Sequence, residues 1–202
     1  RKICTYSAWV KKASLTGNQM LFGGGDSTAR YGFIDFNSNN ELFVQSATSD
    51  STDWALTSTN RYRDVSAWYH IMLVYDSPQA TAADRTKMYV NGSLITLTGT
   101  YVAQSEVSYM CDDSKQIDLF RRVSDGGSSY FDGYAAELHF IEGQALTPAS
   151  FGETDEDTSQ WKAIEYTGTY GTNGFYLDFS NSAALGTDSS GNGNNFTVTN
   201  LA

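Results

Sequence analysis

The segment "KMYVNGSLIT" (residues 87–96) is the strongest local indication of the fold, because it predicts a β-hairpin on its own. Asn91 and Gly92 separate two apolar runs, and these two residue types most readily adopt the positive φ angles that a type I′ turn requires. The twist of such a turn matches the twist of the strands on either side. The segment therefore predicts two antiparallel strands joined by a two-residue loop.

The rest of the chain shows further strand patterns. Residues 3–11 alternate small and aromatic side chains with a period of two, which is typical of a central strand. Residues 68–76 ("WYHIMLVYD") are apolar on both sides, which predicts a strand that is buried on both faces. The ranges 31–36 and 41–47, joined by "NSNN", predict a second hairpin. The other expected strands are residues 19–25, 116–122, 134–141, 174–179 and 195–199.

These strands predict an all-β, antiparallel two-sheet sandwich with helices of a few turns at most. The chain has only two prolines, and no apolar pattern of helical period extends beyond roughly ten residues. Its 202 residues fit one domain, residues 1–202. We expect the core to contain the aromatic residues of the strand runs, namely Trp9, Trp68, Phe140, Phe175 and Phe179.

Composition excludes some classes of partner. The formal net charge is -10 and the isoelectric point is near 4.5. A nucleic-acid partner is therefore not expected, and an anionic membrane surface would repel the chain. We also expect no membrane insertion and see no signal peptide, because no apolar run is long enough. Since the chain begins at Arg1 rather than Met, we interpret it as a fragment or a processed piece.

Two cysteines, Cys4 and Cys111, are too few for a disulfide scaffold or for a zinc site built from cysteines. Free buried thiols are the favoured interpretation, because cysteine is commonly buried. The alternative is a disulfide that closes a loop of about 100 residues, which would stabilise the fold by ~4.7 kcal/mol in the chain-entropy model. Such a bond would point to an oxidising environment.

Five segments carry a family resemblance by their order and spacing. They are "YSAWVKKASLTGNQMLFGGG", "DVSAWYHIMLVYD", "TKMYVNGSLIT", "YFDGYAAELHFIEGQALTPASFGE" and "NGFYLDFSNSAALGTDSSGNGNNFTVTN". Together they resemble the concanavalin A-like (laminin-G-like) jelly-roll domains, and especially those of structural proteins of tailed marine and cyanobacterial phages. The resemblance implies a concanavalin A-like two-sheet jelly roll. It does not fix the function, because this superfamily includes lectins, adhesion modules, glucanases and spacers.

Residues 153–202 are expected to form a C-terminal extension. Domains of the family usually carry another strand before "YSAWV", and the end of this chain resembles that opening segment. One alternative is that the extension completes an edge of its own sandwich. The other is that it pairs with a neighbouring copy, since uncovered sheet edges invite strand pairing, and we therefore expect a homo-oligomer.

The acidic segment "GETDEDTSQW" (residues 152–161) raises the question of catalysis. Glu153, Asp155 and Asp157 occupy alternate positions, which would lie on one face of a strand. The resemblance implies a comparison with glucanases of the superfamily, in which the carboxylates of an E-x-D-x-E strand flank the sugar. However, no apolar residue occupies the alternate positions, and Pro148 and Gly152 precede the segment. We predict a solvated loop with unshifted pKa values; a calcium cage and a catalytic set are the alternatives.

The segment "DSSGNGNN" (188–195) imitates the first half of an EF-hand loop, with Asp188, Ser190, Asn192 and Gly193 at the matching positions. Position twelve would be Thr199 instead of glutamate, and no helices flank the loop. We therefore predict a glycine-rich turn.

Asp112 and Asp113 in "CDDSK" are the metal candidates, and calcium is the only candidate cofactor. The resemblance implies this site, because laminin-G-like domains often bind calcium at loops on the rim of the sandwich. Ca²⁺ prefers oxygen ligands of the kind that such loops supply. A solvated turn is the alternative.

Aromatic residues in polar segments are the carbohydrate-binding candidates, since a flat ring can stack on a sugar beside hydrogen-bonding side chains. The alternatives are that these rings plug the ends of the sandwich, or that the Arg-Tyr pair contacts another protein. The candidates are Trp54, Arg61, Tyr62, Tyr101, Tyr109 and Tyr130.

No nucleophile motif accompanies the two histidines, His70 and His139, which lie within expected strands and are interpreted as structural or outward-facing. We therefore expect a module that is not an enzyme. The resemblance implies a virion-surface location, after assembly in the host cytoplasm, as a tail fibre, spike or capsid decoration. The first hypothesis is adhesion to a host-surface glycan through rim loops. The alternative is structural docking to other virion proteins, and polysaccharide hydrolysis is a third, outlying hypothesis.

Overall fold

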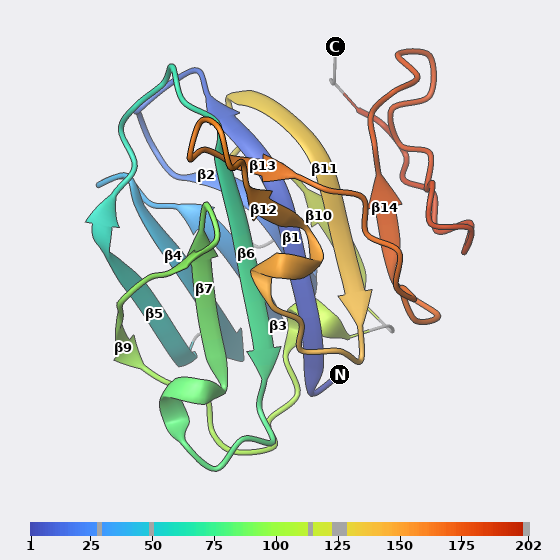
Figure 1. Ribbon diagram of the computed structural model, residues 1–202. Helices are drawn as coiled ribbons and strands as arrows, with labels where there is room; N and C mark the ends of the chain where they lie inside the picture. The colour runs from blue at the N-terminus through green and yellow to red at the C-terminus, as the bar shows by residue number, and fades with distance from the viewer. Residues whose placement is uncertain (28–29, 49–50, 113–114, 123–128, 200–202) are drawn as a thin grey trace.

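The computed structural model describes residues 1–27, 30–48, 51–112, 115–122 and 129–199. In this part of the chain two six-stranded sheets are stacked face to face, and hydrogen-bonded neighbours are antiparallel (Figure 1). The expected all-β sandwich is confirmed. The three helices of the described residues are single 3₁₀ turns, and none has the length or apolar character needed to cross a bilayer.

We name the two sheets by their positions in Figure 1. The front sheet has the order β14 (Phe175–Leu177), β11 (Gly133–Glu142), β1 (Ile3–Lys12), β6 (Tyr69–Asp76), β7 (Thr86–Val90) and β8 (Ser93–Leu94). The back sheet has the order β10 (Gln116–Leu119), β2 (Gln19–Ser27), β3 (Arg30–Phe36), β4 (Glu41–Thr48), β5 (Ser51–Arg61) and β9 (Leu97–Thr100).

The hairpin predicted from Asn91 and Gly92 is confirmed as the connection between β7 and β8. The two turn residues have φ angles of 48° and 77°. Val90 pairs with Ser93, so the loop has two residues as expected. Gly92 is required for a second reason, because a Cβ there would lie 2.6 Å from the ring of Trp161.

The main core lies between the two sheets. On β1 the alternate residues Tyr6, Ala8 and Val10 are almost fully buried, as period-two alternation requires. They face apolar side chains of the back sheet, and the ring of Phe22 stacks on that of Phe140 at 5.3 Å. The core is therefore built by residues from distant parts of the sequence.

Residues 51–61, which include the candidate Trp54, were not expected to form a strand, and this was wrong. They form β5, which lies between β4 and β9. Trp54, Leu56 and Ser58 point inward and are buried, whereas the flanking residues are mostly Ser, Thr, Asp and Asn. Because the outward face carries no large apolar residue, two inward apolar residues were too few to reveal the alternation.

Some expected core residues and one expected strand were also wrong. Trp68 precedes β6 and is 40% exposed, and Trp9 and Phe179 are only half-buried, whereas Phe140 and Phe175 are buried as expected. Residues 195–199 do not form a strand.

The outer face of the front sheet is covered by the hairpin of β12 (Gly152–Thr154) and β13 (Trp161–Ala163) and the segment that follows (Figure 1). A second buried cluster lies beneath it, made of Met72, Val74, Ile141 and Phe151. This cover explains why β6 is apolar on both sides, so the prediction of a strand buried on both faces is confirmed.

His70 fastens this hairpin to the front sheet. The indole N–H of Trp161 donates a hydrogen bond of 3.0 Å to Nδ1 of His70. We therefore assign the proton of the neutral ring to Nε2, which lies 2.8 Å from the Ser7 hydroxyl. Burial lowers the pKa of His70 to about 4. The structural interpretation of this histidine is confirmed.

We predict that the free energy of unfolding falls as the pH drops from about 6.5 to 4. In this window His70 binds a proton in the unfolded chain but not in the folded one, so acidification favours unfolding. A shift from 6.5 to about 4 corresponds to roughly 3 kcal/mol. Urea unfolding across this range measures it. His70→Asn should show a shallower slope than the wild type, and identical slopes would contradict the assignment.

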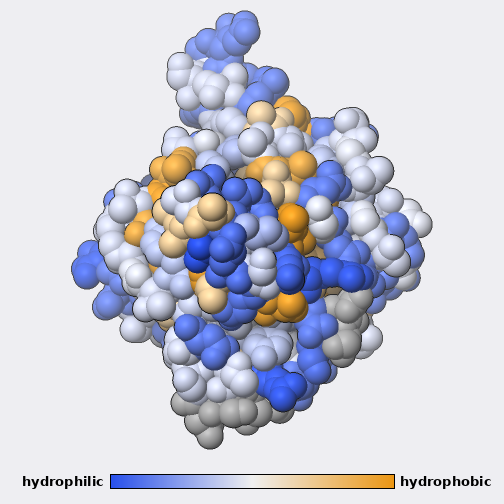
Figure 2. Space-filling view, turned by 90° about the horizontal axis from the view of Figure 1, so that it is seen from below, coloured by the Kyte–Doolittle hydropathy of each residue, from blue (hydrophilic) through white to orange (hydrophobic). Residues whose placement is uncertain are grey.

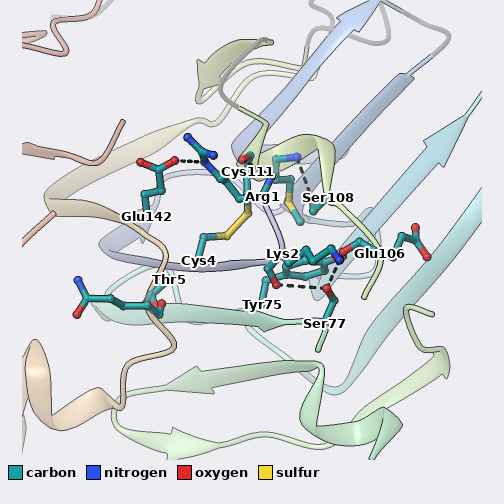
Figure 3. Close-up of a disulfide and its surroundings, with 12 residues drawn as sticks. Arg1, Lys2, Cys4, Thr5, Tyr75, Ser77, Glu106, Ser108, Cys111 and Glu142 are labelled. Carbon is teal, nitrogen blue, oxygen red and sulfur yellow. Dashed lines mark hydrogen bonds and ion pairs between the residues drawn. A yellow bond between two sulfur atoms is a disulfide. The ribbon is translucent and has the colours of Figure 1, made fainter. Parts of the chain in front are cut away.

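Cys4 and Cys111 form a disulfide, so the interpretation as free thiols was wrong (Figure 3). Their Cα atoms are 6.5 Å apart, and 107 positions separate them in the sequence. The bond ties β1 to the 3₁₀ turn Tyr109–Cys111, on the segment that leads into β10. Beside it, Arg1 forms an ion pair with Glu142. Figure 3 shows how these contacts hold the N-terminal residues onto the sandwich.

The C-terminal segment lies along the edge of the front sheet, where β14 pairs with β11 (Figure 1). The strand from this segment therefore occupies the edge of its own sandwich. Seen from the end where the N-terminus lies, the surface is mostly hydrophilic, with small hydrophobic patches near its middle (Figure 2).

Candidate functional site

The described residues line two large hollows. The first, the edge hollow, has a volume of about 880 Å³ and lies between β10 and β14, at the open side of the sandwich. Its inner wall is the apolar core, including Phe120, Phe140 and Phe175.

The second hollow, which we name the tyrosine pocket, has a volume of about 960 Å³ and lies beside β11 on the outer side of the front sheet. The segment 163–172 and the loop 189–192 form the other walls. Its lining combines aromatic rings with hydroxyl, amide and carboxylate groups, a composition typical of ligand sites. The residues that define it here are Glu137, His139, Glu165, Tyr166, Tyr170, Tyr176 and Asn192.

A β-bulge in β11 places Glu137 at the pocket. Ser7 pairs with His139 but Trp9 pairs with Ala136, so β11 has one extra residue at this point. Glu137 takes the strained φ angle of +48°. A left-handed conformation in a residue other than glycine costs about 1–3 kcal/mol, and such strain and bulges concentrate at functional sites. Glu137 is therefore held at the pocket at a cost in backbone energy.

The rings of the pocket form a packed stack. His139 lies parallel to Tyr176 with ring centres 4.3 Å apart, and its Nδ1 is 2.9 Å from the hydroxyl of Tyr170. Tyr166 meets Tyr170 edge to face at 5.2 Å. His139 itself is buried, as the structural interpretation required. The tyrosines are half-buried, so the rings are held in place while part of their surface faces the hollow.

The charge of the pocket is negative. The neighbouring imidazole of His139 and the 2.7 Å hydrogen bond from the Tyr176 hydroxyl lower the pKa of Glu137. Burial lowers the pKa of His139, which favours its neutral form. Burial also raises the pKa values of Tyr170 and Tyr176. At neutral pH the pocket therefore holds a carboxylate beside hydroxyl groups that keep their protons.

The C-terminal loop is anchored at the pocket rim. The side-chain amide of Asn192 donates to the carbonyl oxygens of Gly171 and Gly174. The carboxylate of Asp188 accepts hydrogen bonds from the backbone N–H groups of Tyr176, Ser190 and Asn194. The predicted glycine-rich turn is thus confirmed, and Asp188 organises the loop.

The acidic segment forms the turn of the β12–β13 hairpin instead of a catalytic set. Asp155 accepts hydrogen bonds from the Thr158 backbone and side chain, and Lys162 lies 3.0 Å from Asp155 and 3.3 Å from Glu153. The Thr158 backbone N–H and Lys162 lower the pKa of Asp155 to about 2, so the expectation of an unshifted value was wrong there. Glu153 belongs to a short strand, which was not expected, while Asp157 is exposed.

Two candidate sugar-binding rings are in the core, so the expectation that they face a ligand was wrong. Trp54 is fully buried and Tyr62 is 7% exposed. Trp54 lies at an inward-facing position of β5, and Tyr62 directly follows the strand. Burial of a large ring at such a position contributes most to the core. Both fit the alternative that aromatic residues fill the sandwich.

The other candidates are scattered. Arg61 is exposed and pairs with Glu41 at 3.1 Å. Tyr101 is half-buried against the core. The Tyr109 hydroxyl lies 3.3 Å from that of Thr48.

Tyr130, which is 55% exposed, and Asp112 line the edge hollow, so these two candidates are brought to one site. Asp113 lies outside the described residues. Within the described residues no group of three or more His, Cys, Asp or Glu side chains could hold a metal ion.

The tyrosine pocket was not predicted from the sequence. A signal was present in "EYTGTYG" (165–171), where two tyrosines alternate with threonine and glycine, and in Tyr176 shortly after. What the sequence did not show was the bulge that brings Glu137 to these rings.

Comparison with known proteins bears on this fold. The family described as the concanavalin A-like lectin/glucanases superfamily, Laminin_G_3, matches residues 2–150. No curated protein matches the sequence. Glu137 and His139 lie within the matched region, whereas the tyrosines of the pocket lie beyond it.

Solved structures that are similar in fold have low sequence identity to this chain, and three of them are described here. A carbohydrate-binding module, CBM40, of a Ruminococcus gnavus IT-sialidase, bound to α2,3-sialyllactose, has a TM-score of 0.55 at 17% identity, covering 73% of this chain and 79% of that one. A putative carbohydrate-binding protein of Bacteroides ovatus has a TM-score of 0.58 at 16% identity, covering 96% of this chain and 50% of that one. Domain 4 of the Geobacillus stearothermophilus arabinanase AbnA, in complex with arabinotriose, has a TM-score of 0.52 at 19% identity, covering 73% and 64%.

The family model spans most of the chain, the two stacked antiparallel sheets are the architecture that it implies, and the similar structures share this fold. The chain belongs to the concanavalin A-like lectin/glucanases superfamily.

Proposed function

We propose that this chain is a non-catalytic glycan-binding module and that the tyrosine pocket is its binding site. The observation that carries the proposal is the meeting of three half-buried tyrosine rings and a bulge-positioned carboxylate, Glu137, in one hollow. The similar structures from Ruminococcus and Geobacillus, which are described with bound sugars, support glycan binding as the class of function.

The physical basis is the fit of such a lining to a sugar. Aromatic rings offer flat apolar faces at a small cost in conformational entropy, and they pack against the C–H face of a sugar ring. The Glu137 carboxylate and the tyrosine hydroxyl groups supply acceptors and donors for the sugar hydroxyl groups. The stacked rings and Glu137 are already fixed by their mutual contacts, which lowers the cost of ordering them on binding.

The electrostatics of the pocket support binding over hydrolysis. A glycosidase needs a general acid whose pKa is raised, placed opposite a second carboxylate. Here the surroundings of Glu137 lower its pKa instead, which is the wrong direction for a general acid. Release of reducing sugar from polysaccharides would contradict the proposal.

We predict that Tyr166→Ala weakens glycan binding about tenfold, because it removes one ring face from the pocket wall. A glycan array identifies the ligand, and titration calorimetry compares the variants. Thermal unfolding verifies that the variant folds, since Tyr166 also packs on Phe151 at 5.1 Å.

The matched controls are Tyr134→Ala, at an exposed tyrosine that lines neither hollow, and Tyr130→Ala in the edge hollow. Neither should change the affinity. Loss of binding in Tyr130→Ala, with Tyr166→Ala unaffected, would place the site at the originally expected rim. Loss of binding on calcium chelation would likewise favour a site at the rim, with Asp112 and Asp113 as the candidate calcium ligands.

The proposal extends to the setting of the protein. The resemblance of its sequence motifs to phage structural proteins supports a virion-surface module that attaches to host glycans. Electron microscopy of particles labelled with an antibody against this chain tests that location. The alternative of structural docking predicts that a neighbouring subunit covers the tyrosine pocket, and adhesion predicts that the pocket faces outward.

A further inference from the structure

The charged groups that line the tyrosine pocket are carboxylates. Glu137 and Glu165 line it, and the described lining residues include no lysine or arginine. Lys162, the nearest lysine along the chain to the segment 163–172, lies within ion-pair distance of Glu153 and Asp155 in the hairpin turn. A ligand with a negative charge would therefore meet no cation in this lining.

Histidine does not change this balance. The His139 side chain is buried and stacked on Tyr176. Burial lowers its pKa, which favours the uncharged form. Asp178 and Asp188 add further negative charge around the pocket, since each contributes to the raised pKa of a pocket tyrosine. The bulge holds the Glu137 carboxylate at the pocket while 37% of its side chain stays exposed.

This inference rests on the proposed function. We infer that the tyrosine pocket selects sugars that carry an ammonium group over neutral sugars, and that it rejects sugars that carry a carboxylate. An ammonium group can form a charge-assisted hydrogen bond with Glu137 and lie against the faces of the tyrosine rings. A carboxylate on the sugar would face the carboxylate of Glu137, and the described lining includes no lysine or arginine to offset this repulsion.

The selectivity follows from the site and not from the fold. The Ruminococcus module of the same fold is described with bound sialyllactose, which carries a carboxylate. The present pocket lies partly on residues beyond the family match, so its ligand class is decided by its own lining.

Two pairs of probes test the inference on the full chain by titration calorimetry. The first pair is a glucosamine oligomer and the N-acetylated oligomer of equal length, at a pH at which the free amine is protonated. We expect the glucosamine oligomer to bind about two- to fivefold more tightly, as a partly exposed ion pair allows. The second pair is lactose and sialyllactose; lactose should bind more tightly, and sialyllactose should not bind measurably.

Glu137→Gln should remove most of the preference within the first pair, because the amide still accepts a hydrogen bond but carries no charge. Glu41→Gln is the matched control, because it removes one acidic charge from the back sheet, outside the lining of the tyrosine pocket, and should leave the preference intact. A preference that falls equally in both variants would indicate general attraction to an acidic protein and overturn the inference.

Different results would overturn the charge selectivity and the glycan binding. Binding of sialyllactose as tight as that of lactose, or equal affinities within the glucosamine pair, would overturn the charge selectivity while leaving glycan binding in place. Absence of binding to every glycan on an array would overturn both. The wild-type comparison needs no variant, so it stands even if Glu137→Gln unfolds the strained bulge.

Discussion

Reduction of the bond between Cys4 and Cys111 is expected to lower the free energy of unfolding by about 4.7 kcal/mol. The bond closes a loop of more than half the chain, because 107 positions separate the two cysteines. In the chain-entropy model, opening so long a loop gives the unfolded chain many more conformations, which favours unfolding. Urea unfolding with and without reductant measures the difference.

The double variant Cys4→Ala, Cys111→Ala is the control for the reductant itself. It should unfold at lower urea than the oxidised wild type, and added reductant should not change its curve. Alanine is preferred to serine here because both positions are buried and a hydroxyl would lack a partner. Identical wild-type curves with and without reductant would contradict a stabilising bond.

The second large effect is expected from Trp54→Ala, which should cost about 3–5 kcal/mol of stability. Trp54 is fully buried on β5 and stacks on Tyr75 with ring centres 5.9 Å apart. Truncation would leave a cavity between the two sheets that the surrounding strands cannot close. Chemical unfolding measures the cost.

Trp68→Ala is the matched control, because the same substitution at a 40% exposed ring should change stability by about 0.5 kcal/mol or less. Trp54→Phe should cost less than Trp54→Ala, since it retains a ring and removes an indole N–H that has no hydrogen-bond partner among the described residues. Equal costs at positions 54 and 68 would contradict the placement of β5.

The contrast between these two tryptophans shows where sequence patterns fail. Residues 68–76 are apolar on both sides, so Trp68 was included in the strand, although the strand begins one residue later. Trp54 stands among serine and threonine, which indicated a loop. The inward face of β5 needed few apolar residues because the opposite sheet supplies the rest of the core.

Local features were predictable, and features that depend on distant contacts were not. The turn at Asn91 and Gly92 is encoded in two adjacent residues, and it was predicted correctly. The pairing of Cys4 with Cys111 depends on the complete fold. The tyrosine pocket depends on the bulge at Glu137, which arises where β11 pairs with β1, and on the C-terminal segment that packs beside it.

The tyrosine pocket is proposed to hold the glycan, and this placement can be tested directly. The most direct measurement is a crystal structure of the chain with the oligosaccharide that binds most tightly on the array. We expect a sugar ring against Tyr166 and Tyr170, with a polar group within hydrogen-bonding distance of Glu137. A sugar bound in the edge hollow or on the outer face of the back sheet, with the tyrosine pocket empty, would contradict it.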